Sequence, residues 1–166
     1  MEQAKQFTSP LRKILFCTDF SENADFAFDF AIDAAVRRAG CELHLLHVVP
    51  ESDAQFWKSY MYEVEDVDNK AKRDIDAVID RKYRSRVPQN IPFIVEYRVG
   101  SDSGEILDYA KQKAIDLIVL GRQGQSGLKT VLFGRVTEKV ARHAPCAVLI
   151  IPLTYQKRIA NSGYSI

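Results

Sequence analysis

Strand-like and helix-like segments alternate along this chain, and the alternation limits the folds that it can adopt. Short apolar runs such as 13–18 and 116–120 are typical of buried strands. The longer segments between such runs carry apolar residues at helical spacing, for example Phe26 and Phe30. Because helices separate successive strands, the chain must cross back over the sheet each time, and the strands must pair in parallel. Right-handed crossovers then predict an α/β protein with a doubly wound parallel sheet.

The pattern predicts five strands and four helices. We expect strands at 13–18, 42–49, 91–99, 117–120 and 146–151, and helices at 21–39, 56–84, 101–114 and 134–143. Asp19 and Glu22 have the spacing of a capping box before the first helix, and Gly40 ends that helix. We expect residues 1–12 to form an N-terminal arm, 13–152 a single domain, and 153–166 a polar C-terminal tail.

Composition and charge exclude several classes of protein. The chain has 166 residues and a formal net charge of +1, which predicts one domain without the basic face of a nucleic-acid-binding protein. Its apolar runs are too short to span a bilayer, and residues 1–13 do not resemble a signal peptide. Cys17, Cys41 and Cys146 lie in apolar runs, as buried thiols of a reducing compartment do. We therefore expect a cytoplasmic protein that binds neither nucleic acid nor membranes.

A glycine-containing loop follows the apolar run 116–120 and precedes a predicted helix. Gly121 and Gly124 allow the backbone to approach a phosphate closely, and Gly134 opens a helix whose first amides would point at it. The span 121–136 contains three basic residues and no acidic one. The loop contains neither a Walker A motif nor the dinucleotide-binding pattern of three glycines. The glycines have a second interpretation as turn formers, but their setting favours a phosphate site.

Taken together, these segments make the chain resemble the universal stress protein family over nearly its whole length. The resemblance is carried by ILFCTDFS at 14–21, LHLLHV at 43–48, DLIVLG at 116–121, GRQGQSGL at 121–128 and GRVTEKVARHAPCAVL at 134–149. It implies a five-stranded sheet in the order 3-2-1-4-5 with helices on both faces, an adenine nucleotide alpha hydrolase-like fold. It also implies homodimers formed through the last strand, Cys146 to Ile151, and a stress-response role in the cytoplasm.

One branch of that family binds ATP through the motif Gly-x2-Gly-x9-Gly-(Ser/Thr), and another branch lacks the motif and binds none. The resemblance implies that the three glycines would hold the phosphates of ATP, with or without Mg²⁺, while Asp19 and Val48 would line the base and ribose. Asp19 has a second interpretation as the cap of the first helix. The candidate cofactor-binding residues are Asp19, Val48, Gly121, Arg122, Gly124, Gly134, Arg135 and Val136.

Arg135 departs from the motif, because the ATP-binding branch has Ser or Thr at this position. Its guanidinium would supply charge and hydrogen-bond donors to a phosphate, or would fill the pocket. Three functions stay open: a regulatory ATP-binding protein, a dimeric interaction module that binds no nucleotide, and a slow nucleotide hydrolase or phosphoryl-transfer enzyme. No residue pattern identifies a catalytic base or a metal site, so we expect at most weak ATPase activity.

Overall fold

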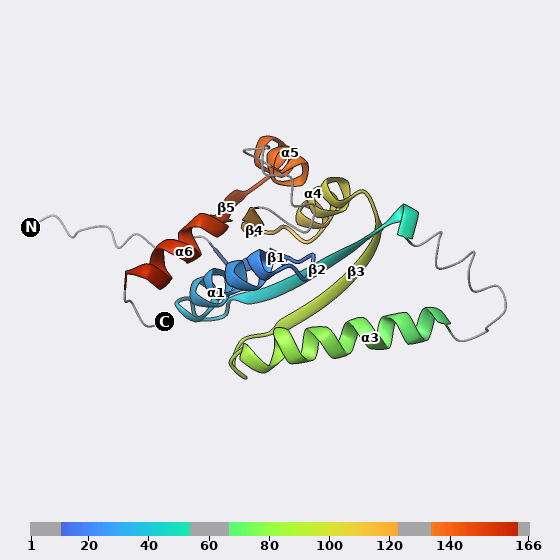
Figure 1. Ribbon diagram of the computed structural model, residues 1–166, viewed down its shortest axis with the longest axis horizontal. Coiled ribbons are helices and arrows are strands. Elements are labelled where there is room, and N and C mark those ends of the chain that lie inside the picture. The colour runs from blue at the N-terminus through green and yellow to red at the C-terminus, as the bar shows by residue number, and fades with distance from the viewer. Residues whose placement is uncertain (1–10, 54–66, 123–133, 163–166) are drawn as a thin grey trace, which may run out of the picture.

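The structure is a computed structural model that describes residues 11–53, 67–122 and 134–162 (Figure 1). Strands and helices alternate along these ranges, as the sequence pattern predicts. In chain order the elements are β1 (Lys13–Cys17), α1 (Glu22–Val36), β2 (Glu42–Pro50), α3 (Val67–Lys82), the 3₁₀-helix η1 (Arg84–Arg86), β3 (Phe93–Gly100), α4 (Asp102–Gln112), β4 (Leu117–Arg122), α5 (Arg135–His143), β5 (Ala147–Pro152) and α6 (Leu153–Asn161).

The five strands form one parallel sheet in the order β3-β2-β1-β4-β5, which confirms the predicted topology. β1 lies at the centre, where Ile14 is in register with Leu43 of β2 and with Leu117 of β4. The strand order reverses between β1 and β4, so this pair marks the switch point at which doubly wound proteins bind ligands.

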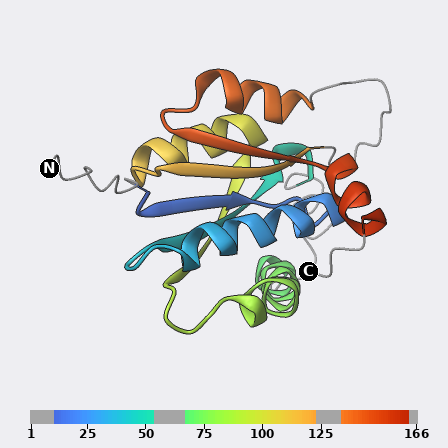
Figure 2. The same cartoon turned by 90° about the vertical axis from the view of Figure 1, so that its left-hand side faces the viewer.

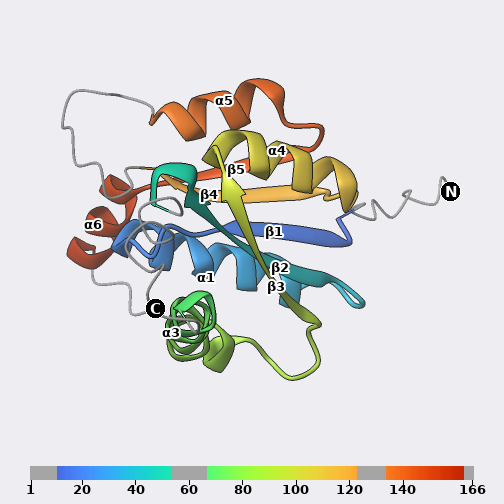
Figure 3. The same ribbon diagram turned by 90° about the vertical axis from the view of Figure 1, so that its right-hand side faces the viewer.

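Helices cover both faces of the sheet, α1 and α3 on one and α4 and α5 on the other (Figures 2 and 3). Because strand side chains alternate, β1 contributes to both layers of the core. Ile14 and Phe16 pack in the cluster under α1 and α3, whereas Leu15 packs in the cluster under α4 and α5. No helix in the described ranges combines the length and the apolar composition that crossing a bilayer requires.

The start of α1 differs from the predicted capping box. Ser21 is the N-cap residue, and its side chain accepts a hydrogen bond from the backbone N–H of Ala24 at 3.2 Å. Asp19 lies two residues earlier, and its Oδ1 accepts from the backbone N–H of Ser21 at 3.0 Å. The backbone turns between them at Phe20, whose φ is 62°. The prediction that Asp19 caps the helix is therefore wrong, because its carboxylate closes the preceding turn instead.

α6 occupies most of the segment for which the sequence pattern predicts only a polar tail. Its Tyr155 and Ile159, one helical turn apart, pack against the core under α1. The ring of Tyr155 lies 6.2 Å from that of Phe26 and 5.9 Å from that of Phe30. At the other long helix, α3 ends at Lys82, near the predicted end at 84, while the predicted start at 56 lies outside the described residues.

Candidate functional site

The turn that follows β1 and the end of β4 lie side by side at the carboxyl edge of the sheet, as expected for neighbouring strands. Asn23, in the first turn of α1, joins them, since its side-chain amide donates a hydrogen bond to the backbone oxygen of Arg122 at the end of β4. Asp19 is exposed in the turn after β1. The candidate residues from the two strands thus lie on either side of the switch point between β1 and β4.

Gly121 is required here by packing. A Cβ atom at this position would lie 2.8 Å from the backbone oxygen of Asn23 and 2.9 Å from its side-chain nitrogen. No side chain fits there unless the first turn of α1 moves away from β4. The absence of a side chain at Gly121 therefore allows α1 to pack closely on the sheet, whether or not a phosphate also approaches this backbone.

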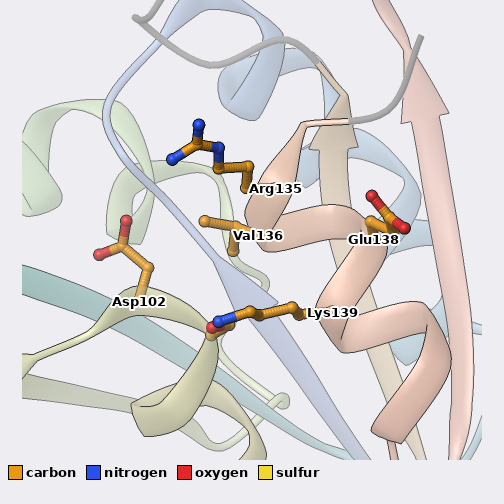
Figure 4. A pocket seen from close by; sticks show the side chains of 6 residues that line it. Asp102, Arg135, Val136, Glu138 and Lys139 are labelled. Atoms are coloured by element: carbon orange, nitrogen blue, oxygen red, sulfur yellow. The ribbon is translucent and has the colours of Figure 1, made fainter. Parts of the chain in front are cut away.

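A pocket of about 290 Å³ lies between the beginnings of α4 and α5 (Figure 4). Figure 4 shows the Arg135 guanidinium and the Asp102 carboxylate on the same side of α5, whereas the Glu138 carboxylate points away from them. The amine of Lys139 extends toward the start of α4. The lining residues are Asp102 and Ser103 of α4 and Arg135, Val136, Glu138 and Lys139 of α5.

The N-cap residue of α5 leaves the amides of its first turn without a side-chain acceptor at that position. Gly134 is its N-cap residue and has no side chain to accept from the amides of the first turn. The atom nearest to a Cβ built on Gly134 would be Oγ1 of Thr137, at 3.8 Å, which is an ordinary contact. The first-turn amides and the exposed side chain of Arg135 therefore face the same region, an arrangement that suits an anion.

His47 of β2 brings the turn after β1 close to the start of α4. Its Nδ1 donates to the backbone oxygen of Thr18 at 2.9 Å, because a carbonyl can only accept, and its ring lies 4.4 Å from that of Phe20. Burial lowers the pKa of His47, while the Thr18 oxygen and the carboxylates of Asp19 and Asp102 act in the opposite direction. These carboxylates are therefore electrostatic neighbours of His47, at the carboxyl edge of the sheet.

Burial also raises the pKa of Asp102, and the carboxylates of Asp19 and Asp53 raise it further, against a lowering by His47. This side of the site is thus acidic, whereas the α5 side carries Arg135 and Lys139. A ligand that fits both sides would offer hydrogen-bond donors or a cation toward the acidic side and an anion toward α5.

Of the residues predicted from the sequence, Arg135 and Val136 line the described pocket, whereas Asp19, Val48, Gly121, Arg122 and Gly134 do not. Val48 is 9% exposed in the core cluster under α4 and α5, and Val136 packs against the same cluster. Gly134 and Arg135 begin α5, and Gly121 and Arg122 end β4. Gly124 lies outside the described residues. The sequence pattern did not identify Asp102, Ser103 or Lys139, although the first two directly follow the end of β3 and so reach the same edge.

Comparisons with known proteins agree with this fold. The sequence model of the universal stress protein family matches residues 10–152. Universal stress protein YxiE of Bacillus subtilis is 30% identical over 145 residues, which cover 84% of this chain and 97% of that protein. The structure of universal stress protein UspA from Lactobacillus plantarum superposes with a TM-score of 0.70 at 31% identity, covering 87% and 99% of the two chains. The structure of protein MJ0577 of Methanocaldococcus jannaschii superposes with a TM-score of 0.67 at 27% identity, covering 85% and 95%. The chain therefore belongs to the universal stress protein family.

Proposed function

We propose that this protein binds an adenine nucleotide, ATP with Mg²⁺, as a regulatory ligand in a cytoplasmic stress response. The observation that carries the proposal is the pocket at the carboxyl edge of the sheet, where α5 begins at Gly134 and presents Arg135 and Lys139. Amides at a helix N-terminus that its N-cap glycine does not cap, together with two nearby cations, suit the phosphates of a nucleotide.

The other side of the same edge suits the base and ribose. Val48, 9% exposed near the end of β2, would supply an apolar contact, and Asp19 and Asp102 would supply carboxylate oxygens that accept hydrogen bonds from a ribose hydroxyl or from an amino group of the base. The pocket volume of about 290 Å³ lies just below the range of roughly 300–1,000 Å³ for ligand sites. The described residues thus fit a phosphate-bearing ligand, and Mg²⁺ would neutralise phosphate charge beside the carboxylates.

The position of Arg135 supports binding. Its side chain is exposed at the mouth of the pocket. A guanidinium there is free to turn toward a phosphate and to donate two parallel hydrogen bonds. An exposed cation would therefore take the place of the hydroxyl of the family motif.

Other proteins with this fold have been solved with adenine nucleotides. One is a universal stress protein in complex with cAMP, with a TM-score of 0.57 at 19% identity. Another is a family member from Arabidopsis thaliana with AMP bound, with a TM-score of 0.50 at 16% identity. At these identities the likeness is one of fold, so the proposal for this chain depends on its own residues.

Thermal unfolding with and without Mg-ATP tests the proposal, with GTP and AMP as comparison ligands. ATP at one hundred times its dissociation constant should stabilise the protein by about 2.7 kcal/mol. For a domain of this length the corresponding increase in Tm is roughly 5–10 °C. An increase with ATP and not with GTP would support an adenine-selective site. No increase with any nucleotide at millimolar concentration would refute the proposal.

Arg135→Ser separates the proposal from the interaction module that binds no nucleotide. If Arg135 donates to the phosphates, the variant should bind ATP more weakly than the wild type. If binding occurs only in the variant, Arg135 closes the natural site, and the interaction module is the function. Arg37→Ser is the matched control, because Arg37 at the end of α1 does not line the pocket and forms an exposed ion pair with Asp33, which contributes little to stability.

We also propose that the protein forms homodimers through β5, the last strand of the sheet. This strand lies at the edge of the sheet, and its apolar residues Val148, Leu149 and Ile150 are only partly buried. Native proteins seldom leave an apolar strand edge uncovered. Sedimentation should therefore show a dimer for the wild type and a monomer for Ile150→Lys, and a monomeric wild type would contradict the proposal.

A further inference from the structure

Ser103 contributes a buried hydroxyl to the pocket between α4 and α5. The residue is 8% exposed, lies in the first turn of α4 and lines the pocket opposite Arg135. No hydrogen bond joins its side chain to another residue that the structure describes, and its oxygen is not among the fully buried polar atoms that lack a partner. A ligand group in the pocket could therefore reach this hydroxyl and form a hydrogen bond with it.

The N-terminus of α4 is also open to the pocket. Its N-cap residue is Ser101, whose side chain makes no capping hydrogen bond to the first turn. The first-turn amides of α4, beginning at Asp102, therefore have no side-chain acceptor at the N-cap position. α4 has 11 residues and α5 has 9, so each is long enough to carry a dipole with its positive end at this pocket.

The charges around the pocket favour an anion between the two helices. Glu138 forms an ion pair with Arg142 at 2.9 Å and points away from Asp102 (Figure 4). The groups that remain are two helix N-termini, Arg135 and Lys139, against the single carboxylate of Asp102 among the lining residues. An anionic group placed here would thus meet the two cations and both helix N-termini as well as the Ser103 hydroxyl, while Asp102 and its neighbours Asp19 and Asp53 oppose it from the α4 side.

We propose that the start of α4 is the second half of the phosphate site, with Ser103 as a phosphate-binding residue. One phosphate group of the nucleotide lies between the N-termini of α4 and α5 and accepts a hydrogen bond from the Ser103 hydroxyl. Ser103 thereby supplies, from the opposite wall, the hydroxyl that Arg135 replaces in the family motif. This inference is an extension of the proposed nucleotide function, because it assigns the residues that recognise the phosphate.

Ser103→Ala tests the inference by isothermal titration calorimetry with Mg-ATP and with adenosine. Loss of a hydrogen bond to a charged group should raise the Kd for ATP about tenfold. The Kd for adenosine should stay unchanged, because adenosine carries no phosphate. Ser101→Ala is the matched control, since Ser101 is an exposed serine of the same turn that does not line the pocket, and it should bind ATP as the wild type does.

A second variant makes the test independent of any effect of Ser103→Ala on folding. Lys139→Gln changes an exposed side chain on the opposite wall, and it should weaken ATP binding several-fold with no change for adenosine. Equal ATP affinity in the wild type and Ser103→Ala would overturn this inference and leave the nucleotide proposal intact. Equal losses for ATP and adenosine would also overturn it, since the defect would not concern the phosphate. No ATP binding by the wild type would overturn both.

Discussion

Tyr83→Phe should destabilise the fold by about 2 kcal/mol, although it removes a single oxygen. Tyr83 follows α3, is fully buried, and reaches the turn between β1 and α1. Its hydroxyl lies 2.6 Å from Oδ1 of Asp25 and 2.7 Å from Oγ1 of Thr18. The same hydroxyl therefore ties the end of α3 to the turn that carries the candidate ligand residue Asp19.

The direction of each hydrogen bond around the Tyr83 hydroxyl follows from which of its partners can only accept. The carboxylate of Asp25 can only accept, so the Tyr83 hydroxyl donates to it, and the Thr18 hydroxyl must donate to the Tyr83 oxygen. Oγ1 of Thr18 in turn accepts from the backbone N–H of Phe20 at 2.9 Å. These three hydrogen bonds hold the turn in place, including the positive φ of Phe20.

The magnitude depends on what remains after the change. A hydrogen bond to a charged group contributes about 1.5–3 kcal/mol, and the Thr18 hydroxyl loses its buried acceptor as well. The carboxylate of Asp25 keeps its ion pair with Lys82 at 2.7 Å, so it is not left uncompensated. The phenylalanine ring keeps the contacts of Tyr83 with Phe16 and Phe28, so no cavity adds to the loss. We therefore expect the free energy of unfolding to fall by about 2 kcal/mol, which lies in the lower half of that range.

Urea unfolding measures the difference in the free energy of unfolding between the wild type and Tyr83→Phe. The slope of this free energy against urea concentration should stay unchanged if the substitution affects only the native state. The Tm should fall by roughly 4–8 °C for a domain of this length. Tyr155→Phe is the matched control, because Tyr155 of α6 contacts the core through its ring. It should change the free energy of unfolding by less than about 0.5 kcal/mol. An equally small change for Tyr83→Phe would refute the assignment of this network.

Three further predictions follow from the packing, the buried histidines and the pocket. Gly121→Ala should lower the free energy of unfolding by about 1–3 kcal/mol in urea, because its Cβ would meet the backbone of Asn23; no loss would show that α1 moves freely. Burial lowers the pKa of His44 and of His47 below 6.5, so at these two residues the unfolded chain binds more protons than the folded protein does. Urea titrations should therefore show the free energy of unfolding decreasing as the pH falls from about 7 through 6.5 toward the lowered pKa values, and a constant free energy of unfolding would contradict this. Asp102→Asn removes a carboxylate that repels phosphates, so calorimetry should show metal-free ATP binding about fivefold more tightly than to the wild type, and Mg²⁺ should increase the ATP affinity of the variant by a smaller factor. If Mg²⁺ increases the affinity of both proteins by the same factor, Asp102 lies away from the phosphates.

Strand positions were predictable from apolar runs, but their ends depend on local turns. The third strand was expected from 91, and it begins at Phe93. Ile91 is buried, as its apolar character suggests, yet its N–H donates to the oxygen of Pro88 at 3.0 Å in a turn before the strand. Burial and strand pairing are different properties, because an apolar residue beside a turn can be buried without pairing with a neighbouring strand.

α6 could not be predicted with confidence from its own residues, because a nine-residue helix is marginal in isolation. It is stabilised by contacts far away in the sequence, where Tyr155 packs against Phe26 and Phe30. The spacing of Tyr155 and Ile159 indicates a helical face only once a partner surface for that face is known.

The two walls of the pocket differ in how they could be predicted from the sequence. The motif around Gly134 identifies α5 directly, whereas nothing in the residues around Ser103 suggests a ligand. The sheet order supplies the missing step. The connections from β3 to β4 and from β4 to β5 run in the same direction across the sheet, so right-handed crossovers place α4 and α5 on one face. Both helices follow the carboxyl ends of their strands, and their first turns must therefore lie at the same edge. Ser103 is thus a candidate phosphate-binding residue because it lies three residues after the end of β3, at this edge of the sheet. Its low exposure distinguishes it from the exposed Ser101, which lies two residues earlier in the chain.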